Sequence, residues 1–329
     1  MKVGIVGMPN AGKSSLFNAL TRAGAEAANY PFTTIEPNVA IVAVQDDRLD
    51  KVAATVGASS VVPDTIAFHD IAGLVAGASK GEGLGNKFLA NIRETDAIVH
   101  VVRAHHDENV IHPEGSVDPL RDIETIDTEL IYADLEQAER RHERVVRQAR
   151  GGDKAAIAEE AWLGEVVEAL QSGRPARTVA VPEAAPNAMR DLSPLTAKPV
   201  LFVANVDEGD DEVPPEIAAH AASHDARAVA ISSRLESELT ELDDEDAAAM
   251  RTDLGVSESG LRRGRSAWHA AGDIHSDIQK GFVRAEVIGW QELVAAGGYA
   301  AARDRGTLRL EGRDYVMQDG DVITVKFTP

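Results

Sequence analysis

Hydrophobic and polar positions alternate from Lys2 to Ile231 in a pattern typical of an α/β protein. Short runs rich in β-branched residues are separated by amphipathic stretches with helical spacing. The predicted strands are Lys2–Val6, Val39–Val44, Thr65–His69, Ala97–Val102, Val200–Ala204 and Ala228–Ile231. We therefore expect a parallel-rich sheet whose strands are connected by helices.

A long insertion separates the fourth predicted strand from the fifth, where one crossover helix would suffice. Residues Ile123–Arg150 have helical spacing without Gly or Pro, Gly151–Gly152 interrupt it, and Lys154–Leu170 resume it. Two antiparallel helices joined at the glycine pair account for this pattern. We expect an inserted helical arm over residues 123–194, between the two parts of an α/β domain over residues 1–122 and 195–260.

The pattern changes again near the C-terminus. Strand-like runs separated by turns occur at Phe282–Ile288, Thr307–Leu310, Asp314–Val316 and Val322–Phe327. Such short runs predict a mixed or antiparallel sheet. We expect a small α+β domain over residues 266–329.

Composition removes several classes of protein. Of the 329 residues, 44% are hydrophobic, which is enough for a packed core. There is no cysteine, which excludes disulfides, iron–sulfur clusters, thiolate zinc sites and a cysteine nucleophile. No apolar run approaches the roughly 18 residues that span a bilayer. The first apolar stretch leads directly into a glycine-rich loop, so we expect no signal peptide and a soluble, cytoplasmic protein.

The formal net charge of −21 argues against loose binding to polyanions. The charge is uneven, because residues 262–329 contain 10 Lys and Arg against 9 Asp and Glu, a net charge of +1. The predicted arm also has a basic stretch, made of Arg140, Arg141, Arg144, Arg147 and Arg150 with the single acidic residue Glu143. This stretch is either an RNA contact or a solvated helix face balanced by nearby glutamates.

The most informative motif follows the first predicted strand. Residues Gly7–Ser14 match the P-loop pattern G-x-x-x-x-G-K-[ST] between a strand and a helix. The N–H groups of such a loop bind phosphates at a helix N-terminus, Lys13 would reach the β- and γ-phosphates, and Ser14 would bind Mg²⁺. The nucleotide-binding residues predicted here are Gly7, Asn10, Ala11, Gly12, Lys13, Ser14 and Ser15.

Two further segments are typical of an NTPase magnesium site. Asp70 ends the third strand, where its carboxylate would hold Mg²⁺ through water, and the N–H of Gly73 would contact the γ-phosphate. Thr34 lies in the loop before the second strand and would complete the Mg²⁺ shell only when a γ-phosphate is present. The alternative for Thr34 is a turn threonine between flanking prolines. We predict a Mg²⁺ site formed by Ser14, Thr34 and Asp70.

The base-recognition segment departs from the guanine-specific pattern N-K-x-D. The fifth strand ends in Asn205-Val206-Asp207-Glu208, so a longer carboxylate replaces aspartate and valine replaces lysine. Adenine offers one acceptor and one amine, whereas the aspartate of the usual motif accepts two hydrogen bonds. We predict that Asn205, Val206, Glu208 and, after the sixth strand, Ser232 form the base site, with ATP bound at least as well as GTP. Compensation by Asp207 is the alternative.

The residue that would position the attacking water differs from that of many GTPases. Leu74 occupies the position where many GTPases carry a water-orienting glutamine, and leucine cannot orient water. Candidate replacements are the histidines His69, His100, His105, His106 and His112. His69 and His100 lie within strands, where packing is the simpler role. His112 lies on a turn-rich loop, where the residues alone favour an ordinary surface histidine.

Together these motifs resemble the YchF family of ribosome-associated ATPases, which is related to the Obg GTPases. The resemblance is carried by Tyr30–Asn38, Asp70–Val75, Gly77–Asn86, Asn91–Glu94, Asn205–Glu208, Ile274–Asp277 and Lys280–Phe282. It implies a Ras-like P-loop core, a coiled-coil insertion and a C-terminal TGS domain of β-grasp fold. It also implies Mg²⁺, ATP preferred over or alongside GTP, and binding to ribosomes, and it identifies His112 as the catalytic histidine.

The chain departs from the family pattern after Gly260–Leu261. In the family a helix and the opening strands of the TGS domain follow, whereas here Arg262–Arg265 lead almost at once to Ala270–His275. A segment long enough for that helix and a β-hairpin is missing. We therefore expect a truncated TGS domain that lacks its first strands.

The leading hypothesis is a Mg²⁺-dependent ATPase switch that associates with ribosomes and modulates translation or a stress response. Its expected partners are ribosomal subunits, through RNA and protein, with neither DNA nor a membrane involved. One alternative is a guanine-specific GTPase, and another is a nucleotide-gated scaffold with incidental hydrolysis. Metabolite kinases also use P-loops, but the order Thr34, Asp70, Asn205 fits a switch better.

Overall fold

The protein divides into two compact units. The computed structural model describes residues 1–25, 38–44, 46–71, 84–105, 107, 110–239, 241–242, 246, 249–250, 284–311 and 319–326. The first unit contains residues 1–42 and 66–271, and the second contains residues 43–65 and 272–329. The second unit therefore combines two stretches that lie far apart in the chain.

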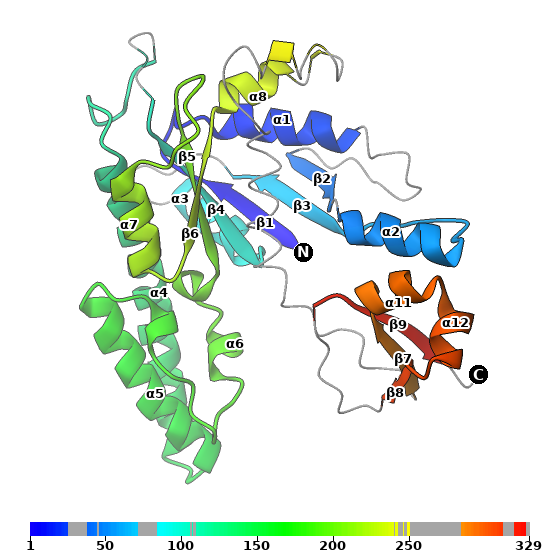
Figure 1. The fold of residues 1–329 in the computed structure, drawn as a ribbon. Coiled ribbons are helices and arrows are strands. Elements are labelled where there is room, and N and C mark those ends of the chain that lie inside the picture. Colours follow the sequence, from blue (N-terminus) through cyan, green and yellow to red (C-terminus); the bar gives the residue numbers. More distant parts are fainter. Residues whose placement is uncertain are drawn as a thin grey trace. The chain divides into compact units, whose positions relative to one another are not determined.

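A sheet with strand order β2-β3-β1-β4-β5-β6 forms the centre of the first unit in the described part of the chain (Figure 1). Its strands are β1 (Lys2–Val6), β2 (Val39–Ala43), β3 (Thr65–Asp70), β4 (Ala97–Arg103), β5 (Val200–Asn205) and β6 (Arg227–Ile231). Neighbouring strands from β3 to β6 are parallel. Asp70 N–H bonds to Asn38 and Val44 N–H to Asp64, so β2 runs antiparallel to β3. This is the Ras-like order that the resemblance predicts.

The parallel strands are continuous apolar runs because both faces of the sheet are covered. Every residue of β4 is buried, including Ile98, Val99, Val101 and Val102. Outside the arm, the helices among the described residues of this unit are α1 (Lys13–Ala25), α3 (Leu84–Arg93), α7 (Pro215–Ser223) and α8 (Ser233–Leu239), and α1 packs against α8. Parallel strands end at one edge of a sheet, so the loops after β1, β3, β4, β5 and β6 meet there.

The predicted arm is a pair of antiparallel helices, α4 (Pro119–Ala149) and α5 (Lys154–Gln171). They join at Gly151–Gly152, and Gly152 has a φ of 81°, which favours glycine. Asp118 and Asp153 cap the two helices by accepting backbone N–H bonds. Helix α4 begins earlier than its predicted start at Ile123, because Pro119 suits the first helical position.

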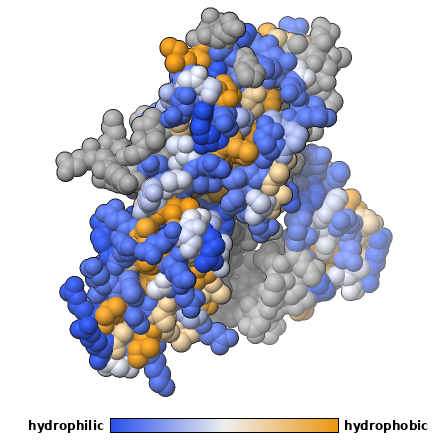
Figure 2. Space-filling model, turned by 90° about the vertical axis from the view of Figure 1, so that its left-hand side faces the viewer, coloured by the Kyte–Doolittle hydropathy of each residue, from blue (hydrophilic) through white to orange (hydrophobic). Residues whose placement is uncertain are grey.

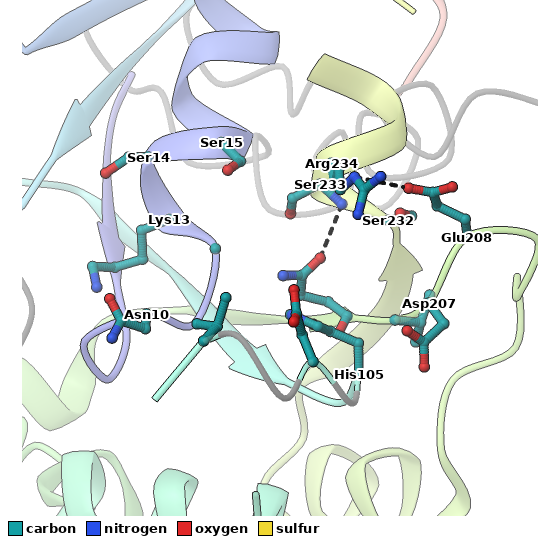
Figure 3. Close-up of a pocket in the computed structure, with 15 residues that line it drawn as sticks. Asn10, Lys13, Ser14, Ser15, His105, Asp207, Glu208, Ser232, Ser233 and Arg234 are labelled. Atoms are coloured by element: carbon teal, nitrogen blue, oxygen red, sulfur yellow. Dashed lines mark hydrogen bonds and ion pairs between the residues drawn. The ribbon is translucent and has the colours of Figure 1, made fainter. Parts of the chain in front are cut away.

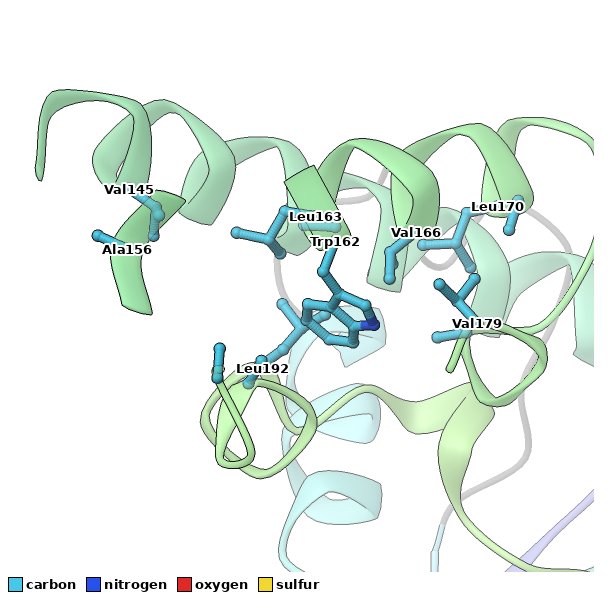
Figure 4. Packing of buried hydrophobic residues seen from close by; sticks show 13 residues of the cluster. Val145, Ala156, Trp162, Leu163, Val166, Leu170, Val179 and Leu192 are labelled. Carbon is cyan, nitrogen blue, oxygen red and sulfur yellow. The ribbon is translucent and has the colours of Figure 1, made fainter. Parts of the chain in front are cut away.

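The arm has its own hydrophobic core, which Figure 4 shows from close by. Trp162, Leu163, Val166 and Leu170 of α5 are each at most 3% exposed. The returning chain contains α6 (Ala188–Leu192) and the 3₁₀ turns Ala176–Thr178 and Leu195–Ala197. Asp134 of α4 is buried and accepts 2.8 Å hydrogen bonds from Leu195 N, Thr196 N and Thr196 Oγ1. These bonds attach the returning chain to α4 just before β5.

The second unit contains an antiparallel sheet with strand order β8-β7-β9 in its described residues. Its elements are α2 (Asp47–Val56), β7 (Arg284–Gly289), α11 (Trp290–Ala296), α12 (Tyr299–Asp304), β8 (Arg309–Glu311) and β9 (Asp321–Lys326). Val52 and Val56 of α2 pack against the buried cluster that contains Ile288 and Leu293. The predicted run Asp314–Val316 lies outside the described residues. No sequence pattern indicated that α2 would belong to this unit.

Polar side chains dominate the face of the molecule drawn in Figure 2, with scattered hydrophobic ones between them. This distribution agrees with the formal charge of −21. Among the helices that the structure describes, none combines the length and the apolar character needed to cross a bilayer.

Candidate functional site

The loop after β1 is shaped by the close approach of its glycines to neighbouring strands. A Cβ atom on Gly7 would lie 2.3 Å from the carbonyl oxygen of Val101. A Cβ on Gly12 would lie 2.2 Å from Nδ2 of Asn205, and Gly12 has a φ of 98°. Both positions therefore need glycine, which leaves the loop N–H groups at the start of α1.

Lys13 and Asp70 bring opposite charges together at the edge of the sheet. Lys13 is 8% exposed, and its Nζ donates a 2.8 Å hydrogen bond to the carbonyl of Met8. Burial lowers the pKa of Lys13 to about 8, while the charge of Asp70 opposes this change. Burial also raises the pKa of Asp70, against the charge of Lys13 and a hydrogen bond with the Ser14 hydroxyl. The structure thus brings together the predicted phosphate-binding lysine and two predicted Mg²⁺ ligands.

Asn205 joins the phosphate-binding loop to the loop after β6. Its Nδ2 donates to the carbonyl of Ala11 at 3.0 Å, and its Oδ1 accepts from the N–H of Ser233 at 2.9 Å. The side chain is 5% exposed, so these bonds replace its contacts with water. Asn205 therefore positions both walls of the site.

These loops enclose a cavity of about 890 Å³, which suits a nucleotide-sized ligand. Its lining residues are Asn10, Gly12, Lys13, Ser14, Ser15, His105, Asp107, Val110, Asn205, Val206, Asp207, Glu208, Ser232, Ser233 and Arg234. Figure 3 shows Lys13 and Ser14 at one end and Glu208 and Arg234 at the other. Of the predicted nucleotide-binding residues that the structure describes, all line this cavity except Gly7 and Ala11 in the loop itself.

The far end of the cavity holds an ion pair that the sequence analysis missed. Arg234 Nε lies 3.0 Å from Oε1 of Glu208 and 3.1 Å from Oε1 of Glu238. A guanine edge presents two N–H donors, which would have to compete with the guanidinium for the Glu208 carboxylate. The sequence shows Arg234 two positions after Ser232, but it does not show that Arg234 pairs with Glu208.

A buried arginine fixes the loop between β4 and α4. Arg103 is 1% exposed, and its guanidinium donates to the carbonyls of His105, Asp107 and Val110 at 3.4, 3.0 and 2.9 Å. His105 also hydrogen bonds through Nδ1 to the carbonyl of Asn205 at 3.0 Å. Arg103 directly follows the predicted strand Ala97–Val102, and no sequence pattern indicated a role for it. Its carbonyl partners explain why Asp107 and Val110 lie beside the nucleotide cavity.

His112 is a buried residue, so its interpretation as an ordinary surface histidine was wrong. Its Nε2 lies 2.8 Å from Oδ2 of Asp122, and their side chains are 4% and 2% exposed. Its Nδ1 accepts a hydrogen bond from the N–H of Glu114 at 3.2 Å. Burial raises the pKa of Asp122, against the hydrogen bond from His112. His112 is not among the described residues that line the cavity.

The loop of His112 is nevertheless linked to the phosphate-binding loop. Asn10 Nδ2 donates a 3.0 Å hydrogen bond to the carbonyl of Ile111, the residue before His112. His100 is 2% exposed, and burial lowers its pKa to about 4, so it is neutral and packed as expected. The remaining predicted residues, Thr34, Gly73, Leu74 and His106, lie outside the described residues.

The sheet order and this cavity define a class of protein. A phosphate-binding loop after β1 and a base-recognition segment after β5, on a Ras-like sheet, make the chain a P-loop nucleotide-binding protein. A family model described as 50S ribosome-binding GTPase matches residues 2–144, and the YchF-GTPase_C model, described as a protein of unknown function, matches residues 256–328.

Known proteins similar to the chain identify the family. The ribosome-binding ATPase YchF of Bacillus subtilis is 46% identical over 362 residues, and that of Escherichia coli O157:H7 is 44% identical over 358, each with 99% of both chains covered. The structure of the Schizosaccharomyces pombe YchF GTPase has a TM-score of 0.83 and 34% identity, covering 99% of this chain and 97% of that one. The chain belongs to the YchF family.

Proposed function

We propose that the chain is a Mg²⁺-dependent ATPase that works as a nucleotide switch. The observation that supports this proposal is the ion pair between Glu208 and Arg234 at the base end of the P-loop cavity. The guanine-specific motif has an aspartate at the position of Glu208. At the other end, the N–H groups of the loop and the ammonium of Lys13 would bind the phosphates. The names of the relatives, ribosome-binding ATPase and GTPase, support nucleotide hydrolysis.

The residues present fit a magnesium ion. The Ser14 hydroxyl and the Asp70 carboxylate are hydrogen bonded to each other, and Mg²⁺ prefers such oxygen ligands. Bound there, Mg²⁺ would neutralise charge on the β- and γ-phosphates. Ser14 would bind the ion directly, Asp70 through water, and Thr34 when a γ-phosphate is present. In the protein without nucleotide, the charge of Lys13 compensates that of Asp70.

The specificity for ATP is tested by calorimetry with ATP and GTP in the presence of Mg²⁺. We expect ATP to bind at least as tightly as GTP, and a tenfold preference for GTP, about 1.4 kcal/mol, would contradict the proposal. Glu208→Asp with Val206→Lys should move the preference towards GTP. Arg234→Ala should do so too, because it frees Glu208, whereas Glu238→Gln, which leaves the pair with Glu208 in place, should change the preference little.

We assign the hydrolytic step to His112, after release from Asp122. In the described conformation both ring nitrogens are engaged, so the loop that carries His112 must rearrange before the imidazole can orient or deprotonate water. The hydrogen bond from Asn10 to Ile111 would couple a change in the phosphate-binding loop to movement of the loop that carries His112. As Mg²⁺ ligands, Thr34 and Asp70 would make this rearrangement depend on whether a γ-phosphate is bound.

His112→Ala should reduce ATP turnover while leaving ATP affinity nearly unchanged. Because this variant removes the hydrogen bond to the buried Asp122 carboxylate and leaves it only Arg121 at 3.7 Å, the double variant His112→Ala with Asp122→Asn controls for stability. His105→Ala is the competing test, since His105 lines the cavity. Parental turnover in the His112 variants, together with loss of turnover in His105→Ala, would transfer the role to His105.

We further propose that the chain associates with ribosomes, as the names of its relatives state for them, which would place it in the cytoplasm. Cosedimentation with ribosomes in sucrose gradients under ATP, a non-hydrolysable analogue and ADP tests this association. We expect more protein in the ribosomal fractions with the analogue than with ADP. Equal absence from those fractions under all three nucleotides would contradict it.

The small domain over residues 266–329 is proposed to be a TGS-like domain without its first strands. The antiparallel strands β7, β8 and β9 support a small sheet there. The alignment with the Bacillus subtilis relative spans 362 positions against 329 residues in the chain, a difference of 33. A deletion of that size would accommodate the missing helix and hairpin. The P-loop domain over 1–122 and 195–260 and the arm over 123–194 complete the proposed organisation, except that residues 43–65 group with the second unit.

A further inference from the structure

A cluster of metal-binding side chains lies where α7 packs against α4, apart from the nucleotide cavity. It consists of Asp127 on α4 and of His220 and His224 at the end of α7. One ligand atom from each residue lies within 4.8 Å of the others. The two histidines are four positions apart in the sequence, so they lie on the same side of α7.

Ring packing holds the His220 side chain in position, and its Nε2 atom makes no hydrogen bond to the described residues. Its ring packs edge-on against Phe202 of β5, with centroids 5.4 Å apart, and stacks on His224 at 4.2 Å. The buried Nε2 atom has no hydrogen-bond partner among the described residues and lies 3.5 Å from Oδ2 of Asp127. Two ligands of a tetrahedral ion with bonds of 2.0–2.1 Å are about 3.3 Å apart, close to this separation.

The hydrogen bonds of His224 favour the tautomer that a metal ligand requires. Its Nδ1 lies 3.0 Å from the carbonyl oxygen of His220 and 3.0 Å from the hydroxyl oxygen of Ser223. The Ser223 hydroxyl donates its one proton to that carbonyl at 2.7 Å, so both neighbours of Nδ1 can accept a hydrogen bond from it. This arrangement favours a proton on Nδ1 and a lone pair on Nε2. A histidine that ligates a metal usually donates its other N–H to a carbonyl or carboxylate in this manner.

We propose that Asp127, His220 and His224 form a binding site for a late first-row divalent cation, with Zn²⁺ as the best fit. Two imidazoles and one carboxylate are ligands that Zn²⁺ accepts and Mg²⁺ does not favour. Small side-chain rotations would bring the ligand atoms from within 4.8 Å to coordinating positions. The fourth position is left to water.

The local charges permit this site. Among the described residues, Arg177 interacts electrostatically with Asp127, and its charge is also balanced by Asp225. His100, which also interacts electrostatically with Asp127 and His220, is buried and neutral. A bound cation would cross-link α7, which follows the base-recognition segment after β5, to α4, the helix that leads into the arm.

The test uses the full chain without nucleotide or Mg²⁺, titrated with Zn²⁺ in a calorimeter. We expect one Zn²⁺ per chain, and His220→Ala or His224→Ala should weaken the affinity by about tenfold or more. Asp127→Asn should weaken it in the same direction. Co²⁺ as a substitute should show the intense visible absorption of a low-coordinate site, and the His224→Ala variant should lose this absorption.

His142→Ala is the matched control. His142 Nε2 lies 3.5 Å from Oε1 of Glu160, but among the described residues no third metal-ligating side chain joins this pair. It should bind Zn²⁺ as the parent does. Zn²⁺ should also raise the Tm of the parent and of His142→Ala but not that of His224→Ala, whose helix end tolerates the change. A parent that does not bind Zn²⁺, or a double variant of His220 and His224 that binds it equally well, would overturn the site.

Discussion

At the scale of single residues, Gly12 shows how contact with a distant strand constrains the phosphate-binding loop. Gly12→Ala would place a methyl group 2.2 Å from Nδ2 of Asn205, which is held by its bonds to Ala11 and Ser233. We predict that this variant folds but loses at least tenfold in ATP affinity, about 1.4 kcal/mol, measured by calorimetry. Gly173→Ala is the control, since Gly173 also has positive φ but nothing within 4 Å. Equal ATP affinity in both variants would show that the contact is unimportant.

Lys13 gives the site a dependence on pH. Burial lowers the pKa of Lys13 to about 8 from 10.5. The stability that comes from neutral, buried Lys13 is therefore fully present above pH 10.5 and is lost as the pH falls through 8. Bound phosphates favour the charged form, so ATP binding in this window should take up a proton.

We predict that ATP affinity falls by up to about tenfold per pH unit above pH 8. Calorimetry at about pH 8.5 in buffers of different ionisation enthalpy would measure the proton uptake directly. Histidines are ordinarily neutral at this pH, and ATP is fully ionised, so Lys13 is the expected source of the signal. Binding heats that do not depend on the buffer would contradict the assignment.

At the scale of elements, the sequence predicted the strands of the first unit to within one residue at each end. Apolar runs of β-branched residues specify such strands locally, as in β4, where every residue is buried. The two helices of the arm were also readable, because Gly151–Gly152 interrupt a long helical pattern, although α4 begins four residues before its predicted start. These elements depend on interactions between residues that are near in sequence.

Pairings over long sequence distances were not readable. The sequence located the phosphate-binding loop and the base-recognition segment, but not the ion pair between Glu208 and Arg234. It proposed His112 without its partner Asp122, whose position depends on where α4 begins. Arg103 bonds to carbonyl groups, which every residue has, so no side-chain pattern reveals its role.

The arm presents exposed arginines towards its tip. Arg141 is tied to Glu159 and Asp191, whereas Arg140, Arg144 and Arg147 are exposed. Arg140 pairs with Glu136 at 3.3 Å, but their side chains are 64% and 60% exposed, so the pair contributes little to stability. These arginines remain the predicted RNA contact of a chain with net charge −21.

We predict that changing Arg140, Arg144 and Arg147 together to Glu weakens ribosome association and flattens its salt dependence, because fewer counterions are released. Cosedimentation at low and high salt measures both effects, and ATP affinity should not change. A matched triple variant carries the same charge reversal at the exposed residues Arg174, Arg190 and Arg227. Equal loss of binding in the two variants would indicate an effect of net charge rather than a contact at Arg140, Arg144 and Arg147.

At the scale of the whole molecule, the second unit is not continuous in sequence. Residues 43–65 belong to it and lie in the chain between Thr34 and Asp70, two predicted Mg²⁺ ligands. Helix α2 contributes Val52 and Val56 to the core around Leu293. Arg48 of α2 also makes 2.9 Å hydrogen bonds to both carboxylate oxygens of Asp319. The unit should therefore unfold with α2 as one cooperative body.

Leu293→Ala tests this cooperativity, because Leu293 is fully buried and its truncation should cost about 2–5 kcal/mol. We predict that hydrogen exchange accelerates in α2 and in β7 together, although the two elements lie far apart in the sequence. Leu163→Ala, at an equally buried position of the arm, should accelerate exchange in α5 without affecting α2. Unchanged protection of α2 in Leu293→Ala would refute a shared unit.

The discontinuous second unit also has a consequence for the chain while it is being synthesised. Helix α2 ends at Val56, and the buried cluster against which it packs begins only with strand β7 at Arg284, after the whole first unit has been made. At about 5–20 residues per second, the ribosome needs on the order of 10–50 s to supply that strand. Val52 and Val56 lack their packing partners throughout this interval, so the nascent chain offers chaperones an apolar segment. A chain that ended before residue 284 would keep Val52 and Val56 without these packing partners.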